Sequence, residues 1–216
     1  MFANLRGTII SKRGDSMKLK WKGIYKSKDQ LPVGDLPSHA VKFKEPNSML
    51  ELNVVAALFV IPVLILIFLA ILIKSLLIKE IVDMNFFNIW GFILAILMII
   101  PHEFLHAIVF PKGEKVELWA SPMALAVFVV STAPISKGRF IFLSLLPNIV
   151  FGLIPLIIWI LLPQNLAITE IVFSFASLSL LLGVGDYLNV FNAARQMPKG
   201  AIQQLSGMNS YWYMPK

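Results

Sequence analysis

The stretch that decides the fold is FFNIWGFILAILMIIPHEFLHAIVF, residues 86–110. It is apolar over most of its length, and a helix needs about 20 such residues to cross a hydrocarbon core of about 30 Å. Near its C-terminal end it contains two histidines and a glutamate, His102, Glu103 and His106. A charged side chain inside a bilayer costs on the order of 3 kcal/mol, so such residues usually mark function. The stretch therefore predicts a membrane span that carries a functional site.

The composition of the whole chain also indicates an integral membrane protein. Of its 216 residues, 57% are hydrophobic and 14% are charged, whereas a soluble domain usually has about 25% charged residues. The chain has no cysteine, which excludes disulfides and thiolate metal sites. Any metal ion must therefore be held by histidine, carboxylate or carbonyl ligands.

The N-terminal 50 residues mix charges throughout and contain no apolar core of the length that a signal peptide needs. We expect the first apolar stretch, which begins near Leu52, to remain in the protein as a signal anchor. The net charge is +7, and ten of the 19 Lys and Arg precede residue 51. A basic segment before a first span is typical of a cytoplasmic anchor, so we expect a lipid bilayer and no nucleic acid as partner.

Four apolar stretches are long enough to span a membrane. They cover about residues 52–73, 86–110, 140–162 and 167–194. A fifth stretch, LWASPMALAVFVVSTAPI at 118–135, is shorter and contains two prolines. This stretch could form a hairpin, a re-entrant loop or a fifth span. In the N-terminal segment, the alternating apolar and basic residues of 17–27 are typical of a strand.

The distribution of positive charge distinguishes these alternatives, because Lys and Arg beside spans concentrate on the cytoplasmic side. With four spans and a cytoplasmic N-terminus, only Lys74 and Lys79 lie outside; with five spans, seven of the 19 do. We therefore expect an all-α integral protein of the cell membrane, with four transmembrane helices and both termini cytoplasmic. A short β-hairpin or re-entrant loop at 116–135 would join helices two and three. The expected segments are a basic cytoplasmic segment at 1–51, a four-helix membrane domain with the functional site at 52–195, and a cytoplasmic tail at 196–216.

The three polar residues of the opening stretch spell H-E-x-x-H. Residues four apart lie on one face of a helix, so His102 and His106 can both reach one Zn²⁺ ion at about 2.0–2.1 Å. Glu103 can take a proton from a water whose pKa the metal lowers toward ~7. The motif predicts a zinc cofactor and metal-assisted hydrolysis with Glu103 as general base. The alternative is that the three are ordinary interfacial residues of a helix end.

A catalytic zinc site needs a third protein ligand and an open position for water. Asp186 lies in LLGVGDYLNVFNAAR, nine residues before Arg195, which places it roughly 13 Å from that helix end at about 1.5 Å per residue. By the same rise, His102 and His106 lie roughly 6 to 12 Å from theirs. Both helix ends face the cytoplasm in the four-span topology, so Asp186 is the predicted third ligand.

Several neighbouring residues are open to two interpretations. Asn148 and Asn189 either support a ligand or substrate by hydrogen bonds, or bond a neighbouring helix. Gly183 and Gly185 either allow a close helix approach or mark a kink. Pro101, directly before the motif, frees a carbonyl one turn back and predicts a kink, although prolines are also tolerated in membrane helices.

These motifs resemble known families. The HEFLH helix and the later GDYLN helix are similar to those of intramembrane site-2 proteases. The closer resemblance is to a small bacterial family of multi-pass zincin peptidases, carried by the motif helix, RFIFLSLLPNI, GDYLNV and PKGA, over about residues 50–213. The resemblance implies that His102, His106 and Asp186 bind zinc and that Glu103 is the general base.

The function expected from these observations is a membrane-embedded zinc metallopeptidase. It would hydrolyse peptide bonds of a membrane protein or peptide in or near the cytoplasmic leaflet, and the 116–135 stretch would offer an edge strand to the substrate. One alternative is a non-catalytic metal-binding membrane protein, such as a sensor or transporter subunit, which would not need Glu103. Another is a structural bundle that binds no metal.

Overall fold

The computed structural model describes residues 18–45, 48–82, 86–124 and 126–216. Within these residues, three helices are long and apolar enough to cross a membrane: Leu50–Ile78, Ile89–Val109 and Lys137–Leu161. A fourth is present only if a pair of helices bent by 48°, Ala167–Leu182 and Val184–Gln196, counts as one span. The predicted apolar stretches therefore correspond to the helices of the structure.

Three of these helical segments contain an interruption. The first joins α1 (Met49–Ala56) to α2 (Val60–Ile78) through the 3-10 turn Ala57–Phe59. The second breaks at Met98, between α3 (Ile89–Leu97) and α4 (Ile99–Val109). Pro101 has no N–H for the carbonyl of Leu97, four residues earlier, which explains why α3 ends there.

The third helical segment contains α5 (Lys137–Asn148), a π-helical turn (Ile149–Leu153) and α6 (Ile154–Leu161). Pro147 lies inside α5, two residues before the turn begins. The bent pair consists of α7 (Ala167–Leu182) and α8 (Val184–Gln196), which meet at Gly183.

The all-α expectation is wrong, because the protein is a mixed α/β structure with two sheets. The first has the order β1-β3-β4, and the second has the order β2-β7-β6-β5. The strands of the first are β1 (Lys18–Ile24), β3 (Lys115–Ser121) and β4 (Ala126–Val130). Those of the second are β2 (Val41–Lys42), β5 (Ile135–Ser136), β6 (Ile202–Ser206) and β7 (Asn209–Tyr213).

The strands pair segments that lie far apart in the chain. β1 runs parallel to β3, with Lys18 opposite Lys115, and β2 runs antiparallel to β7, with Val41 opposite Trp212. Local periodicity can indicate a strand, as it does for 17–27, but it does not show which distant segment the strand pairs with. For this reason the all-α prediction contained no sheet built from distant segments. Of the alternatives for 116–135, the structure has the antiparallel pair β3–β4. The strand expected at 17–27 is confirmed as β1.

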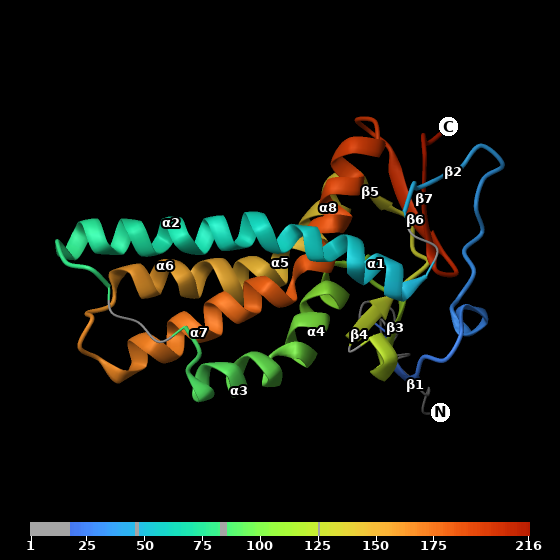
Figure 1. Ribbon diagram of the computed structural model, residues 1–216. Coiled ribbons are helices and arrows are strands. Elements are labelled where there is room, and N and C mark those ends of the chain that lie inside the picture. The colour runs from blue at the N-terminus through green and yellow to red at the C-terminus, as the bar shows by residue number, and fades with distance from the viewer. Residues whose placement is uncertain (1–17, 46–47, 83–85, 125) are drawn as a thin grey trace, which may run out of the picture.

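The sheets lie at one end of the molecule, and the long helices extend away from them. Figure 1 shows α2, α6 and α7 running side by side, while the strands collect at one end next to α1, α4 and α8. A cluster of buried apolar side chains joins the second sheet to α4, α5 and α8 at this junction. It includes Phe43, Val109, Ile135, Phe140 and Ala193. The ends of α4 and α8 are thereby held against the sheets.

Lys74 of α2 is fully buried, and its ammonium group caps the C-terminal end of α6. Its Nζ donates to the carbonyls of Trp159 at 2.7 Å and Leu162 at 2.9 Å. Because Lys74→Met keeps the apolar stem but leaves both carbonyls without this donor, we expect it to lower the free energy of unfolding by about 2 kcal/mol. Denaturant unfolding in detergent measures the change. Lys79→Met, on an exposed residue of the same helix end, is the control, and an equal effect of the two would contradict the capping role.

Candidate metal centre

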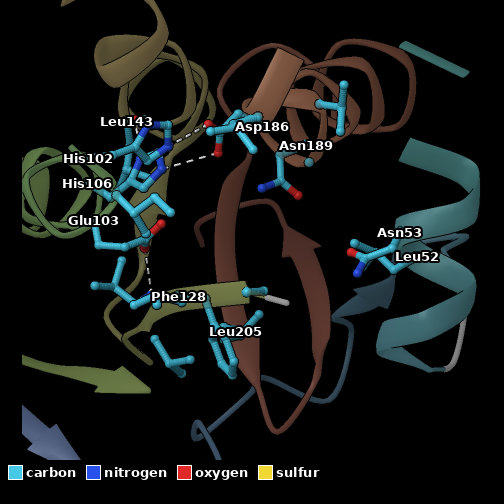
Figure 2. A pocket seen from close by; sticks show the side chains of 18 of the residues that line it. Leu52, Asn53, His102, Glu103, His106, Phe128, Leu143, Asp186, Asn189 and Leu205 are labelled. Atoms are coloured by element: carbon cyan, nitrogen blue, oxygen red, sulfur yellow. Dashed lines mark hydrogen bonds and ion pairs between the residues drawn. The ribbon is translucent and has the colours of Figure 1, made fainter. Parts of the chain in front are cut away.

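The three predicted ligands meet where α4 approaches α8. His102 and His106, one helical turn apart on α4, both direct Nε2 at the carboxylate of Asp186 on α8 (Figure 2). His102 Nε2 lies 3.1 Å from Asp186 Oδ2, and His106 Nε2 lies 3.2 Å from Asp186 Oδ1. One ligand atom from each residue lies within 4.8 Å of the others.

This donor set fits a zinc ion. Tetrahedral Zn²⁺ with bonds of about 2.0–2.2 Å places its ligand atoms roughly 3.4 Å apart, close to the 3.1 and 3.2 Å observed. Two imidazoles and one carboxylate are ligands of the type and number that catalytic zinc sites use, with the fourth position open for water. His102, His106 and Asp186 could therefore hold the ion.

His106 is oriented by its second ring nitrogen. Its Nδ1 lies 2.8 Å from the backbone carbonyl of Leu143 on α5. Since a carbonyl only accepts hydrogen bonds, Nδ1 must carry the proton in this contact. The Nε2 lone pair is then left for a metal ion, and the ring is held in the required orientation.

Asp186 is supported by two further side chains. Asn148, a candidate from the sequence, donates from Nδ2 to Asp186 Oδ2 at 2.7 Å, and Tyr187 donates its hydroxyl to Asn148 Oδ1 at 3.0 Å. Tyr187 was missed by the sequence reasoning, and its position directly after Asp186 was the only signal. Asn189 lies on a wall of the cavity and not against Asp186 (Figure 2).

Glu103 is buried, and a backbone group of the first sheet holds its carboxylate. The N–H of Val129 on β4 donates to Glu103 Oε2 at 2.9 Å. This bond connects α4 to the strand pair that precedes α5, and no sequence pattern indicated it. It leaves the second carboxylate oxygen, Oε1, available for other partners.

A cavity of about 490 Å³ is lined by the three polar residues of the motif and by Asp186. Its walls come from α1, β4, α8 and the β6–β7 hairpin, and they include Asn53, Phe128 and Leu205 (Figure 2). Glu45 also lines it and accepts a hydrogen bond from the N–H of Ser210 at 2.6 Å. Burial raises the pKa of the Glu45 carboxyl to about 7. Both sheets thus form part of the cavity wall. An all-α protein, as expected from the sequence, would have no such wall.

Gly183 allows Asn148 to approach α8, and Gly185 has no such role. A Cβ on Gly183 would lie 1.7 Å from Asn148 Oδ1, whereas a Cβ on Gly185 would meet no heavy atom within 4 Å. We expect Gly183→Ala to displace Asn148 from Asp186 and to weaken zinc binding by about tenfold. Competition with a chelator of known affinity measures this. Gly185→Ala should bind zinc as the wild type does, and the same loss in both variants would contradict the steric account.

Comparison with known families agrees with this geometry. A family described as "Putative zincin peptidase" matches residues 94–202. The chain belongs to this family. Zincins are zinc peptidases that carry H-E-x-x-H, and the matched range includes His102, Glu103, His106 and Asp186. Membership in the zincin family thus supports a zinc metallopeptidase. No curated protein and no solved structure matches the chain.

Proposed function

We propose that this protein is a membrane-embedded zinc metallopeptidase that hydrolyses peptide bonds in or near the cytoplasmic leaflet. The observation that carries the proposal is the convergence of His102, His106 and Asp186 beside the buried Glu103 in one cavity. Membership in the zincin family supports the chemistry. The three long apolar helices support the location.

In the proposed mechanism, His102, His106 and Asp186 would hold a zinc ion, which would supply Lewis-acid chemistry toward the peptide carbonyl and the attacking water. Glu103 accepts the proton of the attacking water at Oε1, since its Oε2 is held by the N–H of Val129. Glu103 then donates that proton to the leaving amine. Its burial excludes bulk water and strengthens these interactions.

The cytoplasmic location rests on charge. The ends of α4 and α8 and the start of α5 lie at the sheet end of the molecule (Figure 1). Among the described residues, the Lys and Arg beside these elements are Lys112, Lys115, Lys137, Arg139, Arg195 and Lys199. The strands β1 and β2 at the same end contain four more lysines, whereas Lys74 and Lys79 lie near the opposite end, in the last part of α2 or directly after it. By the positive-inside rule, this distribution of charge supports a cytoplasmic position for the sheets and the site.

The substrate we propose is an extended segment of a membrane protein or peptide. The N–H of Val129 points to Glu103, so this side of β4 faces the cavity and not β3. Alternate residues of a strand direct their backbone groups to the same side, and Val127 also lines the cavity. A substrate strand can therefore add to β4 and bring its backbone to the metal centre.

The experiment that tests this function compares membrane peptides from cells that carry wild-type protein with those from cells that carry Glu103→Gln. We expect cleavage products of at least one membrane protein only with the wild type, and accumulation of the intact protein with the variant. Identical peptide profiles, with both proteins expressed and zinc-loaded, would overturn the proposal in favour of a non-catalytic metal-binding protein.

A further inference from the structure

Pro147 lies inside α5, where a proline removes one helical hydrogen bond. In an uninterrupted helix the N–H of residue 147 would donate to the carbonyl of Leu143, four residues earlier. Proline has no N–H, and its ring pushes that carbonyl away from the helix axis. The same carbonyl accepts the hydrogen bond of His106 Nδ1 at 2.8 Å.

We propose that Pro147 is a positioning residue of the metal centre. By freeing the carbonyl of Leu143, it holds His106 in the tautomer whose proton is on Nδ1 and directs Nε2 at the metal position. This inference deepens the proposed function and rests on it.

The alternative tautomer shows why the choice matters. With the proton on Nε2, the ring would point an N–H at the Asp186 carboxylate, 3.2 Å away, and would have no lone pair there for a metal ion. The contact between His106 Nδ1 and Leu143 is buried, so water does not compete for the carbonyl. A single backbone acceptor therefore selects the state of His106 that can bind metal.

One region of α5 makes hydrogen bonds to residues of both ligand-bearing helices, α4 and α8. Pro147 acts on His106 of α4 through the carbonyl of Leu143, and the next residue, Asn148, donates directly to Asp186 of α8. The π-helical turn begins immediately afterwards, at Ile149. The proline thus lies at the position in α5 where a free carbonyl and a side-chain amide face the two ligand-bearing helices.

The test is Pro147→Ala, which restores an N–H that competes with His106 for the carbonyl of Leu143. We expect zinc affinity to fall by about tenfold, the lower range for loss of a partner that orients a ligand. The matched control is Pro155→Ala, which removes the other proline of the same helical segment, about two turns farther along it from Leu143. The control should bind zinc as tightly as the wild type does.

A spectroscopic readout separates positioning from general stability. The chain has three histidines, so ¹⁵N-histidine labelling gives three imidazole spin systems, and His39→Gln simplifies their assignment. In the zinc-loaded wild type we expect metal on Nε2 of His106 and a hydrogen-bonded proton on Nδ1. In Pro147→Ala the Nδ1 proton signal should shift toward that of a weaker hydrogen bond.

The outcomes distinguish this inference from the proposed function. Unchanged zinc affinity and an unchanged His106 signal in a folded Pro147→Ala protein would overturn the role of Pro147 while the wild type still binds zinc. A wild type that binds no zinc would overturn the proposed function itself. If the variant does not fold, the wild-type spectrum decides, because metal on Nδ1 of His106 contradicts the inference and metal on Nε2 with a bonded Nδ1 proton supports it.

Discussion

Replacement of Asp186 by alanine should abolish stoichiometric zinc binding. The carboxylate is the one charged ligand, and its two oxygens face the Nε2 atoms of His102 and His106 at 3.1 and 3.2 Å. Without it, two neutral imidazoles remain, which is fewer than the three protein ligands of catalytic zinc sites. We expect affinity to fall by more than about 100-fold, beyond the 10–100-fold typical of residues that only orient a ligand. Metal analysis of purified protein and competition titration measure the loss.

The matched control for Asp186→Ala is Glu170→Ala. Glu170 is an exposed carboxylate in the first turn of α7, the other half of the same bent pair, and it contacts Asn88. Its removal should leave zinc content unchanged. Full zinc occupancy in Asp186→Ala would show that the zinc ion is held by other ligands.

The second large effect is expected for Glu103→Gln, which should bind zinc normally and lose hydrolytic activity. Glutamine retains an oxygen that can accept the hydrogen bond from the N–H of Val129, now 2.9 Å from Glu103 Oε2, so the junction of α4 and β4 is preserved. It cannot accept a proton from water, and general acid–base catalysis contributes about 10²–10⁴ in rate. Turnover of a cleaved peptide, with metal content measured on the same sample, tests both parts.

A carboxylate on the neighbouring strand provides the control for this substitution. Glu117 on β3 pairs with Lys22 of β1 at 3.2 Å and belongs to the same sheet. Glu117→Gln should retain activity. Loss of zinc together with activity in Glu103→Gln would mean that Glu103 maintains the metal centre, and full activity in that variant would exclude it as the general base.

Interactions between residues close in sequence were enough to predict the helices and the shared helix face of the two motif histidines. Apolar stretches of sufficient length correspond to the helical segments because every backbone hydrogen bond of a helix is made within the segment itself. His102 and His106 share a face because helical spacing requires it. Asp186 was predicted from its depth in the four-span topology, and the family resemblance implied the same residue. In the structure, one carboxylate oxygen of Asp186 lies beside Nε2 of His102 and the other lies beside Nε2 of His106.

Only the tertiary structure decided the rest, because it depends on backbone groups that meet across long sequence separations. The sheets pair Lys18 with Lys115 and Val41 with Trp212, and side-chain periodicity carries no information about such partners. The N–H of Val129 reaches Glu103, and the carbonyl of Leu143 reaches His106. The sequence by itself determined which side chains can bind the metal ion. Packing of α5, α8 and β4 around α4 determined how those side chains are held, since backbone donors and acceptors are common to all residue types and become specific only when the chain is folded.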